Sequence, residues 1–179
     1  MTRIDEYDFG IAHPADRDLT AAAFRCEPLG IVRALRQGAL VDVASRNGFT
    51  PLMWVAFRSA VGFDPIGAAR WLIAAGSDIN RSGGKPPTVA LTLACEMGST
   101  ALVEHMLLSG ADPNPPAHVD PPLHSALPQL DIVRLLLSAG AERTRLWNGL
   151  TALDRYEELW RDPRHGDPDQ DALIRHLLG

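Results

Sequence analysis

The sequence predicts an all-α fold in which about five helix-turn-helix units follow one another along the chain. The first observation behind this prediction is a glycine that recurs at intervals of 38, 34, 30 and 39 residues, at Gly38, Gly76, Gly110, Gly140 and Gly179. The second observation is a short apolar run before each of these glycines. Self-similarity at a period of roughly 20 to 50 residues is typical of proteins built from stacked repeats.

The apolar runs predict the second helix of each unit. Their apolar residues recur every three or four positions, so that each run gives a helix one apolar face. Glycine adopts a positive φ without the steric cost of a Cβ atom, and we therefore expect the glycine after each run to end the helix. The five runs lie at 31–35, 69–73, 102–108, 132–137 and 173–178.

The segment 47–53 (Asn-Gly-Phe-Thr-Pro-Leu-Met) predicts the start of a first helix. Its Asn-Gly pair favours a tight turn, its threonine can cap the helix N-terminus, and its proline suits the first helical position. Residues 122–124 keep the Pro-Leu-His part of this pattern, and residues 148–153 keep the turn, the capping threonine and a leucine. Residues 89–94 keep only the apolar pattern, and they are assigned to the third unit because the units before and after it are recognisable.

These segments resemble the Gly-x-Thr-Pro-Leu-His signature of ankyrin repeats. The resemblance covers residues 19–179 and implies an ankyrin-repeat solenoid with short β-hairpin-like loops, preceded by an acidic lead-in at 1–18. It also implies that the histidine of Pro-Leu-His, His124, forms a local hydrogen bond that orients loop backbone. The five expected repeats span about 19–46, 47–82, 83–117, 118–146 and 147–179.

Three segments depart from the repeat pattern. About five extra residues around 59–66 predict a surface loop between the two helices of the second unit. Pro128 falls where the first helix of the fourth unit should end, which predicts a shortened helix. The segment 162–169, with two prolines and a glycine, predicts a loop inside the last unit.

Composition and charge restrict the classes of partner. The formal net charge is −5 and Lys85 is the only lysine, so we expect no nucleic-acid binding and favour a basic partner. No run reaches the roughly 20 apolar residues of a membrane-spanning helix, and the N-terminus lacks the pattern of a secretory signal. Cys26 and Cys95 lie far apart in apolar segments, which predicts reduced core thiols in a cytoplasmic protein.

Three segments are candidate sites of chemistry. His118, Asp120 and His124 could form a metal cluster, or fragments of a hydrolase together with Ser125, but flanking prolines and the repeat pattern favour structural or binding roles. The acidic segment 162–169 lacks the ligand spacing of a calcium loop. Residues 82–85 lack the first glycine of a phosphate-binding loop and favour an elongated hairpin turn. We therefore predict no catalytic residue, no metal site and no cofactor.

The resemblance implies that a partner binds the hairpin tips and the solvent side of the first helices. Phe49, Phe57 and Trp147 are the expected aromatic anchors, because aromatic residues and arginine are enriched among interface hot spots. Trp54 and Trp71, by contrast, are expected in the core between units. The full set of predicted contact residues is Arg46, Asn47, Phe49, Phe57, Arg58, Arg81, Lys85, Glu96, Met97, His118, Asp120, Gln129, Trp147 and Asn148.

The predicted function is non-enzymatic binding of a specific partner protein by a chain that is monomeric when free. The favoured role is that of a bacterial immunity protein that inhibits a basic toxin domain, since compact ankyrin-type immunity proteins resemble this chain and complementary charge speeds association. A scaffold or host-directed effector that binds a regulatory protein is the alternative. A metal-dependent hydrolase is the remote alternative.

Overall fold

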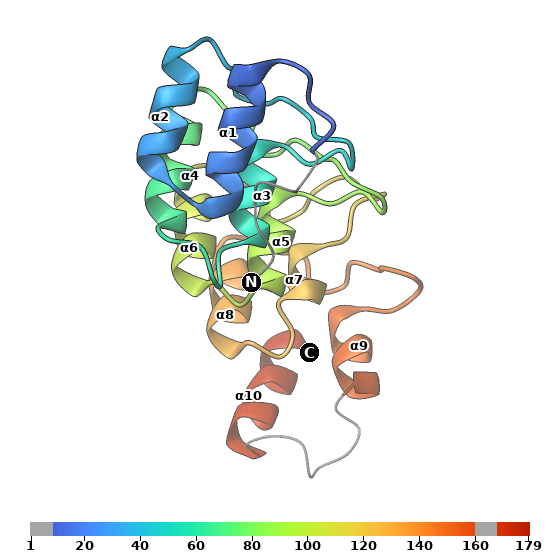
Figure 1. Cartoon of the computed structure of the whole chain (residues 1–179). Coiled ribbons are helices and arrows are strands. Elements are labelled where there is room, and N and C mark those ends of the chain that lie inside the picture. The colour runs from blue at the N-terminus through green and yellow to red at the C-terminus, as the bar shows by residue number, and fades with distance from the viewer. Residues whose placement is uncertain (1–8, 160–167) are drawn as a thin grey trace.

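The computed structural model of the chain describes residues 9–159 and 168–179. These residues form ten helices and no β-strand, which confirms the all-α class. The helices are arranged in two rows that run the length of the molecule (Figure 1). Their bounds are α1 Pro14–Arg25, α2 Pro28–Arg36, α3 Pro51–Phe57, α4 Pro65–Ala74, α5 Ala90–Glu96, α6 Thr100–Leu108, α7 Pro122–Ser125, α8 Leu130–Ser138, α9 Ala152–Leu159 and α10 Pro168–Leu178.

Each row is formed by alternate helices. One row consists of α1, α3, α5, α7 and α9, in which each helix packs against the next. The other row consists of α2, α4, α6, α8 and α10, packed in the same order. We call them the first row and the second row, and a helix pair is one helix of the first row with the helix that follows it. The loops that enter the first-row helices project to one side (Figure 1).

Local sequence determines where the helices begin and end. Proline opens six of the ten helices, where its missing N–H and fixed φ are compatible with the first turn. Thr50 caps α3 as predicted, because its side chain accepts a hydrogen bond from the Met53 amide at 3.3 Å. The predicted glycine stops are confirmed after α2, α4, α6 and α8, with φ near +90° at Gly38, Gly76, Gly110 and Gly140.

An aromatic cluster anchors the core between α1 and α3. The Trp54 side chain is only 2% exposed, as predicted, and its ring makes edge contacts with four phenylalanines. Its indole Nε1 donates a hydrogen bond to Ser45 Oγ at 3.1 Å, so the polar atom of the ring is satisfied inside the core. The four rings belong to Phe9, Phe24, Phe49 and Phe57.

A ladder of side-chain hydrogen bonds joins consecutive helix pairs. Asn80 Nδ2 donates to the carbonyl of Gly110 at 3.2 Å, and Asn80 Oδ1 accepts from the amide of Asp112 at 2.8 Å. Asn114 makes the same two contacts with the turn that follows α8, and Asp42 makes related contacts with the turn that follows α4. Each link joins the turn after one second-row helix to the glycine turn after the next. The links therefore fix the spacing between helix pairs where these turns lie.

The structure changes two predictions about the chain. The boundary predicted between residues 18 and 19 falls inside α1, which begins at Pro14, and Phe9 is buried ahead of it. The helix start was missed because His13 forms no side-chain cap. Trp71, predicted as a core residue, is 51% exposed, because α4 turns its apolar Ala69 and Leu72 inward and leaves the indole on the outer surface.

The irregular segments follow the predictions where the structure describes them. The loop at 58–64 lies on the surface between α3 and α4, with Phe63 85% exposed. The first-row helix before Pro128 is reduced to the four residues of α7. Most of the predicted loop at 162–169 lies outside the described residues, and its last two positions already belong to α10. None of the helices in the described ranges is long and apolar enough to span a bilayer.

Candidate functional site

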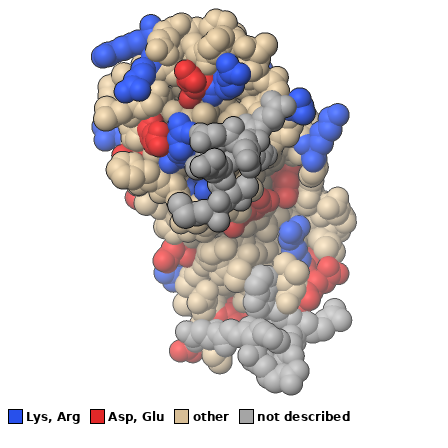
Figure 2. Space-filling view, viewed as in Figure 1, with Lys and Arg blue, Asp and Glu red and all other residues tan. Residues whose placement is uncertain are grey.

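The first row and its loops form the candidate functional surface. On the face shown in Figure 2, Lys and Arg gather over the half that contains α1 and α2, whereas Asp and Glu are more frequent over the other half. The most unusual charged group on this surface is a pair of carboxylates, Glu96 and Asp120, supplied by neighbouring helix pairs. We call them the carboxylate pair.

Backbone and side-chain contacts hold the carboxylate pair in place. Glu96 is the last residue of α5, and Asp120 lies in the loop directly before α7. Thr92 Oγ1 donates a hydrogen bond to the carbonyl of Asp120 at 2.8 Å, which ties this loop to α5. Ser125 Oγ donates to Asp120 Oδ2 at 3.3 Å, while Oδ1 is buried and accepts no hydrogen bond from the described residues.

The environment of the pair disfavours its negative charge. Although Glu96 is exposed as a residue, partial burial of its carboxyl raises the pKa of that group, and the charge of Asp120 raises it further. Burial likewise raises the pKa of Asp120, against the opposing effect of the Arg155 guanidinium and the hydrogen bond from Ser125. Arg155 therefore offsets the cost of the two charges only in part, and a second cation placed over the pair would lower both pKa values.

His124 is buried and contacts loop backbone of the next helix pair. Its side chain is 1% exposed, and its Nε2 lies 3.1 Å from the carbonyl of Arg145 in the loop of the next helix pair. The contact orients loop backbone, as the resemblance implied, but it reaches the next helix pair instead of being local. Burial lowers the pKa of the imidazole, so the ring is neutral at pH 7 and Nε2 is the donor to that carbonyl.

The candidate metal ligands His118, Asp120 and His124 do not converge on one point, although Ser125 hydrogen-bonds to Asp120. His118 is exposed in the loop, Asp120 is half-buried, and His124 points into the neighbouring helix pair. Within residues 9–159 and 168–179, no three His, Cys, Asp or Glu side chains come together as a metal-binding group. Residues 82–85 form the hairpin turn that was predicted, closed by two hydrogen bonds between Gly83 and Thr88.

Most of the predicted contact residues lie on the loops and on the ends of the first-row helices. The loops at 45–49 and 81–88 approach each other closely, since a Cβ on Gly48 would lie 2.8 Å from the amide nitrogen of Gly84. These loops therefore present one continuous edge. The predicted contact residues that are exposed are Arg46, Asn47, Phe57, Arg81, Lys85, Glu96, His118 and Asn148.

Several predicted contact residues are half-buried instead of fully exposed. Phe49 is half-buried, with its ring 5.2 Å from the Trp54 ring, so it supports the core instead of projecting as a free anchor. Arg58 is also half-buried and stacks on the Phe24 ring, 4.6 Å from its centroid. The helix-end residues and the remaining aromatic are half-buried as well: Met97, Asp120, Gln129 and Trp147.

Sequence reasoning missed Arg155, which faces the carboxylate pair from α9. The signal was weak, because an arginine one turn into a polar helix looks like an ordinary solvated residue. It also treated Glu96 and Asp120 as independent contact residues. Their proximity depends on the packing of α5 against α7, across 24 residues of sequence that contain a complete second-row helix.

Comparison with models of known protein families gives no match to the chain, and a search of curated proteins finds none with significant similarity.

Proposed function

We propose that the chain is an ankyrin-repeat protein whose first row and loops bind a basic region of a partner protein. Support for the repeat assignment comes from the two helix rows, the glycine turns with positive φ, and the hydrogen-bond ladder between successive pairs. Stacked helix pairs of this kind offer an extended surface for protein binding. On this proposal the chain is not an enzyme, and it acts in the cytoplasm as a monomer until it meets its partner.

The carboxylate pair is the observation that carries this proposal. Two carboxylates whose pKa values are both raised leave negative charge that Arg155 only partly offsets. An arginine of the partner could donate hydrogen bonds to both carboxylates, since its planar guanidinium presents several N–H donors in a fixed fork.

The proposed role is inhibition by occlusion. A basic toxin domain bound over the carboxylate pair would have its surface covered by the first row, and no chemical step would be needed from this chain. Complementary charge would raise the association rate, which matters for an inhibitor that must act before its target does. A scaffold or effector role would use the same surface and differs only in the identity of the partner.

The test begins with affinity capture from the native lysate, identification of the partner by mass spectrometry, and titration calorimetry with the purified partner. The variant Glu96→Gln/Asp120→Asn removes both charges and keeps the side-chain shapes. We expect it to weaken binding at least about tenfold, because one buried charged contact is worth on the order of 2 kcal/mol or more. A partner with toxin activity that the chain abolishes at equimolar ratio would support the inhibitor role.

The matched control is Asp131→Asn, which removes one exposed charge from α8 in the second row. It should leave affinity unchanged. If a stoichiometric partner binds the charge-free double variant as tightly as the wild-type chain, the carboxylate pair is not the contact and the proposal fails.

A further inference from the structure

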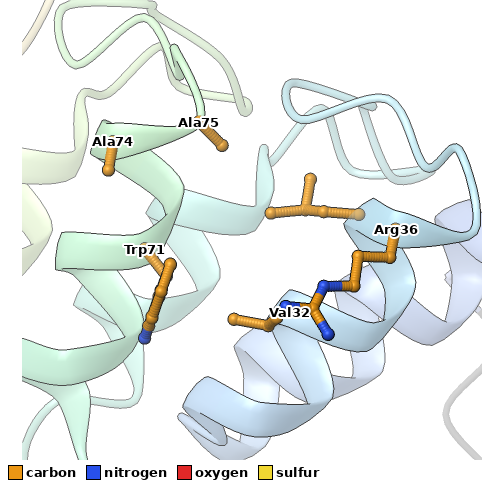
Figure 3. A pocket seen from close by; sticks show the side chains of 6 residues that line it. Val32, Arg36, Trp71, Ala74 and Ala75 are labelled. Atoms are coloured by element: carbon orange, nitrogen blue, oxygen red, sulfur yellow. The ribbon is translucent and has the colours of Figure 1, made fainter.

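The second row carries a groove that the proposed first-row surface does not include. It lies between α2 and α4 and has a volume of about 320 Å³. Val32 and Arg36 approach from one helix and Trp71 from the other, with Ala74 and Ala75 at the end of the groove (Figure 3). Apart from the arginine, every side chain that lines it is apolar.

Helical spacing explains why the groove stays open. On α4, Gly67, Arg70, Trp71 and Ala74 recur every three or four residues and share one face. The small residues at 67 and 74 leave space around the indole, and these four residues line a second hollow of about 410 Å³. Trp71 lines both hollows and is 51% exposed, although burial of a tryptophan ring is among the larger apolar gains available to a folded chain.

The charged residues of the groove are both cations. Arg36 lines the hollow between α2 and α4, and Arg70 lines the second hollow. Neither guanidinium forms an ion pair within the described part of the chain. The groove on the second row therefore presents positive charge, whereas the carboxylate pair on the first row presents negative charge.

We propose that the groove is a second protein-binding site, which takes an acidic segment of a partner with one large apolar side chain. The apolar side chain would occupy the hollow against Trp71, and flanking Asp or Glu side chains would pair with Arg36 and Arg70. Tryptophan and arginine are the residue types most enriched among interface hot spots, and here they share one concave surface. The proposal goes beyond the first-row function and does not depend on it.

The probe is a synthetic nonapeptide with a central Leu-Phe flanked on both sides by Asp and Glu. A second peptide carries Lys at every acidic position, and a third keeps the acids but has Gly-Ser in place of Leu-Phe. Titration is followed by ¹H–¹⁵N spectra of the full chain, with the Trp71 indole signal assigned from Trp71→Phe. We expect the first peptide alone to shift that signal in a saturable way, and added salt to weaken its binding.

Three variants test the contacts. Arg36→Glu and Arg70→Glu should each weaken binding of the acidic peptide about tenfold, and Ala74→Met should weaken it by filling the groove while Trp71 stays in place. Arg134→Glu on α8 reverses an exposed charge outside the groove and should have no effect. Glu96→Gln/Asp120→Asn should also leave peptide binding unchanged, which separates this site from the carboxylate pair.

Four results would overturn the proposal. The first is equal binding of the lysine peptide, the second is no saturable shift of the Trp71 indole with the acidic peptide, and the third is indifference to Arg36→Glu and Arg70→Glu. Self-association of the chain that is lost in Trp71→Ala would also overturn it, because the groove would then be an interface between two copies. Sedimentation velocity of both proteins measures that outcome.

Discussion

Asn114 Nδ2 donates a hydrogen bond to the carbonyl of Gly140, 2.9 Å away, and so connects the turn after α6 to the turn after α8. Its Oδ1 accepts from the next turn as well, at the amide of Glu142. One side chain thus satisfies a donor and an acceptor at a helix end that would otherwise depend on water. The contact repeats at Asn80, which makes it a property of the stack and not of one turn.

The ladder predicts a stability cost that repeats from link to link. We expect Asn80→Ala and Asn114→Ala each to lower the free energy of unfolding by about 1–2 kcal/mol, since each removes two hydrogen bonds between helix pairs. Urea denaturation followed by circular dichroism measures the change. Asn80→Asp keeps the acceptor and should lose less, as Asp42 already serves one link with a carboxylate. Equal losses for Ala and Asp at position 80 would contradict the role of the acceptor.

The two tryptophans at 54 and 71 should differ sharply in their effect on stability. Trp54→Ala removes a buried ring at the centre of the aromatic cluster and should cost about 3–5 kcal/mol. Trp71→Ala removes a half-exposed ring and should cost less than about 1 kcal/mol. Thermal unfolding of the two variants side by side measures the difference. A large loss for Trp71→Ala would mean that the indole is needed for packing, and would weaken the case for a free groove.

The raised pKa values of the carboxylate pair predict a pH-dependent effect of Glu96→Gln. When the pKa of a carboxyl is higher in the folded state than in the unfolded state, the folded chain binds the proton more strongly. The wild-type protein therefore loses stability as the pH rises from the unfolded-state pKa to the folded-state pKa. The neutral glutamine avoids this loss. The variant should therefore be more stable than the wild type at pH 7, with the advantage shrinking toward pH of about 4, the ordinary carboxyl value.

Urea midpoints between pH 4 and pH 7 measure this difference. Glu104→Gln, an exposed carboxylate of α6 in the second row, is the control and should show no such trend. An advantage of Glu96→Gln that is the same at every pH would argue that charge is not its cause.

The cysteines should resist modification in the folded chain. Burial raises the pKa of the Cys26 thiol to about 11 and raises the pKa of Cys95 still further, so little thiolate is present at pH 8. Both thiols are free and buried. We expect iodoacetamide to label neither residue at pH 8 until urea unfolds the chain, when both react. Intact-mass spectrometry over time checks this, and rapid labelling of the native protein would show that one of the two sites opens.

The sequence was most informative where a residue acts on its own turn or helix end. Gly76 and Gly110 end helices because of their φ, and Thr50 caps α3 through its own side chain, so both kinds of feature were predicted correctly. Trp71 was misplaced because position on a helix face depends on which neighbouring helix covers that face. The groove at Trp71 could not be predicted for the same reason. Alanines at 74 and 75 leave a hollow only if no side chain of the facing helix fills the space, and the sequence does not show which helix faces them.

The candidate site was predicted in its members but not in its geometry. Glu96 and Asp120 were both expected on the binding surface, yet nothing in the sequence placed one beside the other. Phe49 was expected as a free anchor because it follows a turn, but the closeness of the Trp54 ring draws it into the aromatic cluster. The Asn80 and Asn114 contacts have a signal in the sequence, because an asparagine lies four residues after Gly76 and again four residues after Gly110.

The ladder does not extend to the last helix pair. Thr144 stands where Asn80 and Asn114 stand in the earlier turns, and within the described residues its side chain makes no link of that kind. α9 and α10 are held instead by contacts such as Tyr156 Oη to Asp171 and Gln170 to the carbonyl of Pro128. In a stack of nearest-neighbour contacts, the most weakly coupled end opens first. Amides of α9 and α10 should therefore exchange with solvent deuterium through partial unfolding, while those of α3 and α5 exchange only when the whole stack unfolds.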